Sequence, residues 1–126
     1  MKLFADLACW EFQKTFPDEF DSYGCGPGGV GDFFVPDTVY GLSIRAACRI
    51  HDWGYRYSLA ASDSDRKRHD RILLNNSLRI VHAKTNWRFL LMLRARRCRT
   101  YYQMVRAFGG PAYWEERNKE NRVHDV

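Results

Sequence analysis

Four residues near the middle of the chain have side chains and spacing suited to acid–base chemistry. His51 and Asp52 are adjacent, Tyr55 follows three residues after Asp52, and Asp70 lies further along. A histidine accepts a proton from water at neutral pH because its ordinary pKa is about 6.5. A carboxylate on the other ring nitrogen fixes the tautomer and stabilises the imidazolium. These residue types therefore indicate a general base and the carboxylate that orients it.

Two helices are needed to bring these groups together. The pattern of residues 42–61 predicts a helix with one arc of about 100° that holds Ile44, Cys48, His51, Asp52 and Tyr55. A second helix, predicted over residues 65–83, carries Asp70 within an apolar arc. Adjacent helices joined by a short link pack antiparallel, which lets Asp70 reach His51. A buried aspartate needs such a partner, and the same geometry also suits a purely structural pair.

A glycine-rich segment precedes the first of these helices. Residues 23–29 read Tyr-Gly-Cys-Gly-Pro-Gly-Gly, with four glycines in seven positions. Such backbone freedom lets carbonyls converge on a hard cation or amides converge on an anion. The segment lacks the spacing of a phosphate-binding P-loop, which argues against nucleotide binding.

Four cysteines allow three pairings if they are oxidised. A disulfide between Cys25 and Cys48 would hold the glycine-rich segment one helical turn from His51. Cys9 and Cys98 either pair with each other or stay free. A zinc site formed by Cys25, Cys48 and His51 is a further alternative, although it would displace that disulfide.

Taken jointly, these segments resemble the secreted phospholipase A2 superfamily, and most closely its lean microbial and viral branches. The resemblance rests on Gly-Cys-Gly-Pro-Gly-Gly at 24–29, Cys-Arg-Ile-His-Asp-Trp-Gly-Tyr at 48–55, and Asp70, and it covers residues 23–81. It implies an all-α fold with two antiparallel core helices, a calcium loop beside them and, in this chain, a third long basic helix. It departs from the family pattern at Gly24, where the family has a tyrosine, and in the long insert at 30–40.

The resemblance also implies roles for individual residues. His51 matches the general base, Asp70 the carboxylate that orients it, and Tyr55 a hydroxyl that holds that carboxylate. The implied Ca²⁺ ligands are the Asp52 carboxylate and the backbone carbonyls of Gly24, Gly26 and Gly28. A calcium ion and a backbone amide, here that of Gly26, can stabilise the oxyanion formed when water attacks an ester. The expected activity is calcium-dependent hydrolysis of the sn-2 acyl ester of glycerophospholipids by a histidine-activated water.

Charge is distributed unevenly along the chain, whose net charge is +5. Residues 71–114 contain nine Lys or Arg residues and no Asp or Glu. Arg88, Arg99 and Arg106 fall on one narrow stripe of the predicted third helix, with Arg96 nearby. A solvated face, an anionic membrane surface and nucleic acid are the three interpretations of this stripe, in that order of preference, so nucleic acid is the least expected partner. The rival to the esterase is therefore a basic helical nucleic-acid-binding module with a structural His51–Asp70 pair.

The remaining patterns predict one all-α domain over residues 1–126 without a convincing strand. Leu3, Phe4, Leu7 and Ala8 indicate a short N-terminal helix that is interrupted near Pro17, and glycine and proline make residues 24–41 a loop. Asn86 is expected to cap the third helix, which ends at Phe108, and a short helix is expected at 112–119. The apolar run 89–93 is too short to cross a bilayer. No secretory signal is recognised, so we expect cytoplasmic synthesis, with later release or packaging in a particle left open.

Overall fold

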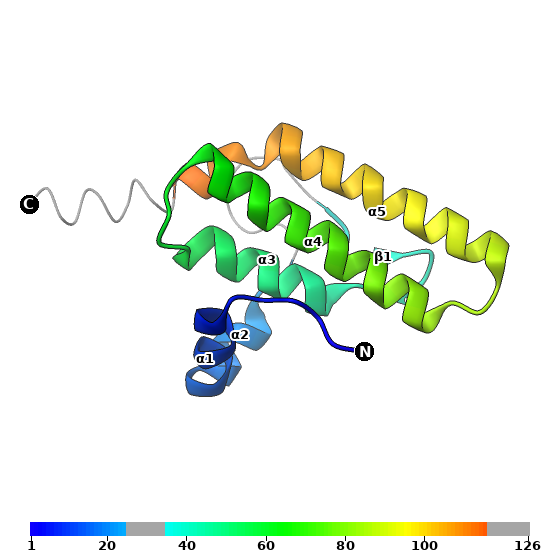
Figure 1. The fold of residues 1–126 in the computed structure, drawn as a ribbon, viewed down its shortest axis with the longest axis horizontal. Coiled ribbons are helices and arrows are strands. Elements are labelled where there is room, and N and C mark those ends of the chain that lie inside the picture. The colour runs from blue at the N-terminus through cyan, green and yellow to red at the C-terminus, as the bar shows by residue number, and fades with distance from the viewer. Residues whose placement is uncertain (25–34, 116–126) are drawn as a thin grey trace, which may run out of the picture.

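Three long helices form the body of the molecule (Figure 1). The structure is a computed structural model and describes residues 1–24 and 35–115. Its elements are α1 (Leu7–Thr15), α2 (Pro17–Ser22), β1 (Thr38–Val39), β2 (Leu42–Ser43), α3 (Arg45–Tyr57), α4 (Asp63–Lys84) and α5 (Arg88–Phe108). Residues 110–115 are helical too, so the expected last helix exists but begins two residues earlier than predicted, and positions 116–119 lie outside the described residues. The mostly helical character agrees with the all-α part of the predicted fold class.

The central helix α4 packs against α3 on one side and α5 on the other. Its start is fixed locally, because the Ser62 hydroxyl accepts a hydrogen bond from the Asp65 amide at 3.0 Å. Asp63 and Asp65 in the first turn suit the positive end of the helix dipole. The helix therefore begins two residues before the position expected from the sequence. The short connection from α3 gives the antiparallel pair on which the site depends.

The ends of α5 show why capping residues are hard to place from sequence. The predicted cap, Asn86, is wrong: Trp87 occupies the N-cap position with an extended backbone and no side-chain bond. Asn86 therefore lies one residue too early to reach the helix amides. At the other end the helix stops at Phe108, as predicted. The Gly109 amide donates a hydrogen bond to the Val105 carbonyl at 2.9 Å. A Cβ at Gly109 would lie only 2.6 Å from that carbonyl oxygen.

The N-terminal segment differs from its prediction. Residues 3–6 are not helical, and α1 begins at Leu7. The Phe4 amide donates to Asn76 Oδ1 and the Asn76 amide group donates to the Phe4 carbonyl, both at 2.7 Å. Because Asn76 is fully buried, this exchange fixes the segment against α4. Pro17 interrupts the helical pattern as expected, but it also occupies the first turn of a second helix, α2.

A small hairpin lies within the segment predicted to be a loop without strands. β1 and β2 pair antiparallel, with Thr38 opposite Ser43 and Val39 opposite Leu42. Tyr40 and Gly41 make the turn with positive φ angles of 46° and 80°. Arg94 on α5 donates to the Tyr40 carbonyl at 2.9 Å. The expectation of no strand was therefore wrong, because contacts with a distant helix stabilise a hairpin too short to leave a periodic signal.

Two apolar clusters hold the elements together. One lies among α3, α4, α5 and the hairpin and includes Cys98, and the other joins α1 and α2 to α3 and α4 and includes Cys9. These two buried cysteines are free thiols and do not pair with each other. In the described part of the chain, no helix is both long and apolar enough to cross a membrane.

Candidate functional site

The predicted histidine and aspartate meet between α3 and α4. His51 Nε2 lies 2.7 Å from Asp70 Oδ1, and the Asp70 side chain is completely buried. The His51 side chain is 10% exposed. Because an ionised carboxylate only accepts hydrogen bonds, Nε2 carries the ring proton and Nδ1 keeps its lone pair. The arrangement leaves Nδ1 as the nitrogen able to accept a proton.

Tyr55 supplies a second hydrogen bond to the same carboxylate oxygen. Its hydroxyl donates to Asp70 Oδ1 at 2.6 Å, and its ring lies 4.3 Å from the His51 ring, centre to centre. Burial, followed by the negative charge of Asp70, raises the pKa of Tyr55 above its ordinary value. The phenol therefore stays protonated and acts as a donor. His51, Tyr55 and Asp70, which were predicted to share a site, are in direct contact.

Two arginines that the sequence reading did not place in the site also face Asp70. Arg106 Nη1 donates to Asp70 Oδ2 at 2.7 Å, and Arg66 Nη1 lies 3.6 Å from the same oxygen. Arg66 also donates to the main-chain carbonyls of Val105 and Arg106, each at 3.1 Å. Arg66 stands four residues before Asp70 on one helix, a spacing that could have indicated the pair. No sequence signal marks Arg106.

The stripe assigned to the third helix must be corrected accordingly. Arg88 and Arg99 are exposed, as is Arg96, but Arg106 turns inward to the buried carboxylate. Helical position alone could not distinguish these residues. It gives the direction of each Cβ atom, whereas the end of a long side chain can point elsewhere. Only the part of the stripe formed by Arg88, Arg96 and Arg99 is a solvent-facing basic surface.

The electrostatics of Asp70 follow from its four neighbours. Burial by itself raises the pKa of a carboxyl group, since it disfavours the charged form. Hydrogen bonds from His51, Tyr55 and Arg106 outweigh that cost, and the pKa of Asp70 lies below its ordinary value. Asp70 is therefore ionised at neutral pH and can stabilise a positive charge on His51.

The second predicted carboxylate, Asp52, lies at the edge of the glycine-rich segment. Its Oδ2 accepts a hydrogen bond from the Gly24 amide at 3.4 Å, and its Oδ1 accepts one from Arg56 Nε at 3.1 Å. The Arg56 guanidinium also stacks over the Tyr23 ring at 4.8 Å. The Asp52 side chain is 23% exposed, which leaves it accessible to a ligand. This contact places the first residue of the glycine-rich segment against Asp52.

Other members of the predicted calcium site and disulfide are not described. Gly26, Gly28 and Cys25 lie outside the described residues, so their roles stay predictions. Cys48 is buried and is not a free thiol, which leaves the zinc alternative without a thiolate at that position. Its pairing with Cys25 also stays a prediction.

The ligand atoms available around Asp52 suit a hard cation better than a soft one. Within residues 1–24 and 35–115, no three His, Cys, Asp or Glu side chains are grouped to hold a metal ion. Asp52 would therefore be joined by backbone oxygens, and carboxylate and carbonyl oxygens are the ligands that Ca²⁺ prefers. The guanidinium of Arg56 would compete with a cation for Asp52.

A second buried network supports the site from the other end of α3. Asp65 accepts hydrogen bonds at 2.7 Å from the Ser58 and Tyr113 hydroxyls, and His69 Nε2 lies 3.5 Å away. Burial lowers the pKa of His69, so its ring is held in the neutral form. The ring packs directly on Gly54, where a Cβ would overlap it. This contact lets α3 and α4 approach closely enough for His51 to reach Asp70.

Comparison of the chain with protein-family models, curated proteins and solved structures found no match.

Proposed function

We propose that the chain is a calcium-dependent esterase that hydrolyses the sn-2 acyl ester of glycerophospholipids. The observation that carries the proposal is the buried carboxylate of Asp70, 2.7 Å from His51 Nε2. It supports a base whose remaining nitrogen, Nδ1, can take a proton from water. The ester, the sn-2 position and the metal are inferred from the resemblance of residues 23–81 to the phospholipase A2 superfamily.

The residues of the site have distinct parts in the proposed reaction. His51 Nδ1 accepts a proton as the water oxygen attacks the ester carbonyl, and Asp70 stabilises the imidazolium. When the tetrahedral intermediate collapses, the C–O bond to glycerol breaks and His51 returns the proton to the leaving alkoxide. The products are a fatty acid and a lysophospholipid. The backbone amide of Gly26 is the proposed donor to the oxyanion.

Asp52 and the backbone carbonyls of Gly24, Gly26 and Gly28 are the proposed calcium ligands. Bound there, Ca²⁺ would supply positive charge that stabilises the developing oxyanion. Asp52 is suited to this role because it is partly exposed and lies against the first residue of the glycine-rich segment.

An anionic phospholipid surface is the proposed partner, and the corner between α4 and α5 suits it. Trp87, Phe89 and Met92 are 64%, 55% and 64% exposed, and the first two rings lie 5.6 Å apart, centre to centre, with their planes tilted by 49°. Lys84 and Arg88 are exposed beside them. Aromatic side chains settle at the headgroup level of a bilayer, and basic residues are attracted to anionic lipids.

The decisive experiment measures fatty-acid release from vesicles of mixed anionic and zwitterionic phospholipid under oxidising conditions. We expect release with calcium, none with a chelator, and a loss of at least 100-fold in His51→Ala. The matched control is His82→Ala, an exposed histidine at the other end of α4, which should keep full activity. If His51→Ala stayed active, the general-base role would be wrong.

The metal assignment has its own test. Asp52→Asn should lose calcium binding in titration calorimetry and lose hydrolysis, while its circular dichroism keeps the helical signal. Calcium-dependent turnover in Asp52→Asn would refute the assignment. His51→Ala should bind calcium as the wild type does, which separates the metal site from the base.

The rival function is a nucleic-acid-binding module in which His51 and Asp70 are structural. It predicts that the folded protein releases no fatty acid from any vesicle. It also predicts that the protein binds nucleic acid with an affinity that does not depend on calcium. The same release assay therefore decides between the two functions of the His51–Asp70 pair.

A further inference from the structure

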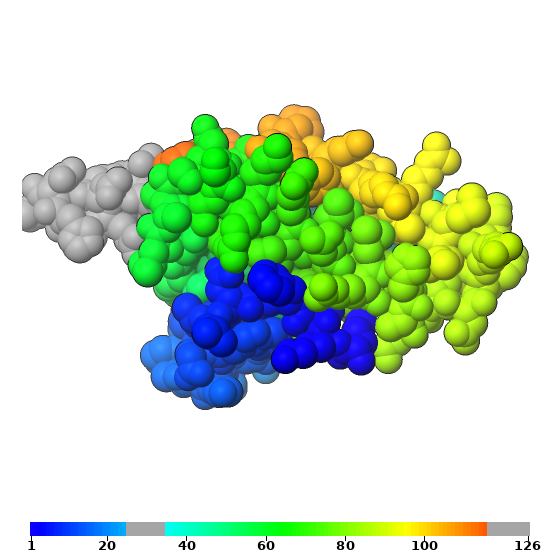
Figure 2. Space-filling model, viewed as in Figure 1, coloured from blue at the N-terminus to red at the C-terminus, as the bar shows by residue number. Residues whose placement is uncertain are grey.

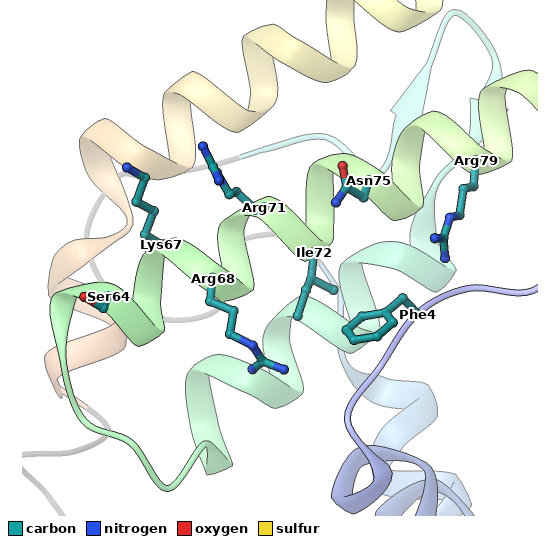
Figure 3. A pocket seen from close by; sticks show the side chains of 8 residues that line it. All are labelled: Phe4, Ser64, Lys67, Arg68, Arg71, Ile72, Asn75 and Arg79. Carbon is teal, nitrogen blue, oxygen red and sulfur yellow. The ribbon is translucent and has the colours of Figure 1, made fainter.

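A basic groove runs along the outer side of α4, where the N-terminal segment lies against that helix. Figure 2 shows the N-terminal segment in blue beside α4 in green, and Figure 3 shows the side chains that line the groove. Its volume is about 530 Å³. The lining includes four cations and two apolar side chains: Lys67, Arg68, Arg71, Arg79, Phe4 and Ile72.

The groove is separate from the His51 site. At 100° per residue, Lys67 and Arg71 lie about 60° and 100° around α4 from Asp70, and Arg68 and Arg79 lie about 160° and 180° from it. Asp70 faces α3 and α5, whereas Arg68 and Arg79 extend toward the side of α4 on which Phe4 lies, and Lys67 and Arg71 extend along the opposite edge of the groove (Figure 3). An occupant of the groove would therefore not compete with a substrate at His51.

Most of the positive charge in the groove is uncompensated. Arg68 pairs with Asp6 through both of its terminal nitrogens. Lys67 and Arg71 are exposed, and in the described ranges neither makes an ion pair. Arg79 contacts only a neutral acceptor there, the Lys2 carbonyl, at 3.5 Å. The surface attracts an anion and offers several unshared donors.

Three of the cations are spaced along α4 in multiples of four residues, and each step of four also turns about 40° around the helix. Lys67 and Arg71 are one step of four residues apart, and Arg79 is two further steps along. Each step corresponds to a rise of about 6 Å. A second hollow shares Phe4 and Arg79 with the first and continues past Lys2 to Trp10. The result is an extended basic track, which fits a chain of repeated negative charges better than a single anion.

An aromatic side chain lies in the same track. Phe4 is 48% exposed and sits beside Ile72 in the wall of the groove (Figure 3). Its backbone is held by Asn76, so the ring is presented from a fixed position. Exposed aromatic rings beside a basic groove provide stacking platforms for unpaired bases.

We propose that this groove binds single-stranded nucleic acid. Lys67 and Arg71 contact neighbouring phosphates, Arg79 contacts a phosphate further along the strand, and Phe4 stacks on a base. A bilayer surface suits the site less well, because a flat array of headgroups does not enter a recess between a helix and a neighbouring segment. The proposal does not depend on the esterase function.

The test measures fluorescence anisotropy of a fluorescein-labelled 12-nucleotide oligothymidine with the full chain and a chelator present. We expect Lys67→Ala/Arg71→Ala to weaken binding at least tenfold. The slope of log affinity against log salt should fall by about 1.4, at about 0.7 per lost phosphate contact. The matched control, Arg96→Ala/Arg99→Ala, removes the same charge from exposed positions on α5 and should weaken binding less than threefold. Equal losses in both double variants would overturn the proposal, since net charge alone would explain them.

A second variant tests stacking apart from charge. Phe4→Ala should weaken oligonucleotide binding about tenfold, whereas Phe108→Ala, an exposed phenylalanine at the end of α5, should leave it unchanged. Urea unfolding of each variant shows that it is folded. If the oligonucleotide did not bind and anionic vesicles bound through Lys67 and Arg71 instead, the groove would be a lipid site and the proposal would be wrong.

Discussion

Arg106 Nη1 donates to Asp70 Oδ2 at 2.7 Å and joins α5 to the aspartate that faces His51. One carboxylate thus receives the imidazole and the Tyr55 hydroxyl on one oxygen and Arg106 on the other. We expect Arg106→Gln to lower the free energy of unfolding by about 2 kcal/mol, because it removes a charged hydrogen bond to a buried group. Urea unfolding measures this loss. The control, Arg99→Gln on the exposed side of α5, should change stability by less than about 0.5 kcal/mol. Equal effects would mean that the Asp70 contact contributes nothing.

Arg56 is expected to oppose calcium binding. Its guanidinium neutralises Asp52 at 3.1 Å, so a cation that binds Asp52 must displace it. Arg56→Gln should therefore tighten calcium binding about threefold to tenfold, which titration calorimetry can measure. Arg45→Gln, an exposed arginine at the start of α3, is the control and should not change the affinity. Unchanged affinity in Arg56→Gln would argue against Asp52 as a ligand.

Gly54 is required by the packing of α3 on α4. Gly54→Ala should destabilise the protein by about 1–3 kcal/mol, because the added methyl overlaps the His69 ring. Gly110→Ala is the matched control, since its nearest neighbour would be Arg66 Cζ at 3.9 Å. This second variant should be neutral or slightly stabilising. Thermal unfolding of both proteins distinguishes a local clash from a general effect of alanine.

His69 makes stability depend on pH below neutrality. Burial lowers its pKa in the folded state, so the unfolded chain binds more protons once the pH falls below the ordinary histidine value of about 6.5. The stabilisation by neutral His69 is complete above that pH and is lost as the pH falls toward the folded-state pKa. His69→Gln should flatten the dependence of unfolding free energy on pH between about 6.5 and 5. An unchanged slope would show that His69 is not held neutral.

The free cysteines give a test of the predicted disulfide. Burial raises the pKa of Cys9 to about 12 and that of Cys98 to about 11. Both thiols should resist a disulfide-exchange reagent in the native protein. After denaturation without reductant, two thiols should react if Cys25 and Cys48 are joined, and four after reduction. Four reactive thiols before reduction would contradict the predicted pairing.

The helices that carry the site could be predicted from sequence because periodicity is a local property. Apolar residues spaced for one helical face placed His51, Tyr55 and Asp70 on facing arcs, and the short link between their helices fixed an antiparallel pair. The spacing of Arg66 from Asp70 was also available in the sequence. These features depend on residues within a few turns of one another.

Contacts between distant segments were decided by the tertiary structure alone. Arg106 could not be distinguished from Arg99 by position, because its direction depends on where α5 crosses α4. Asn76 holds the segment around Phe4 in a non-helical form, although its residue pattern suits a helix. That contact also builds the wall of the basic groove. The sequence therefore determined which faces had to be buried, whereas packing determined which long polar side chains reached inward and which stayed exposed.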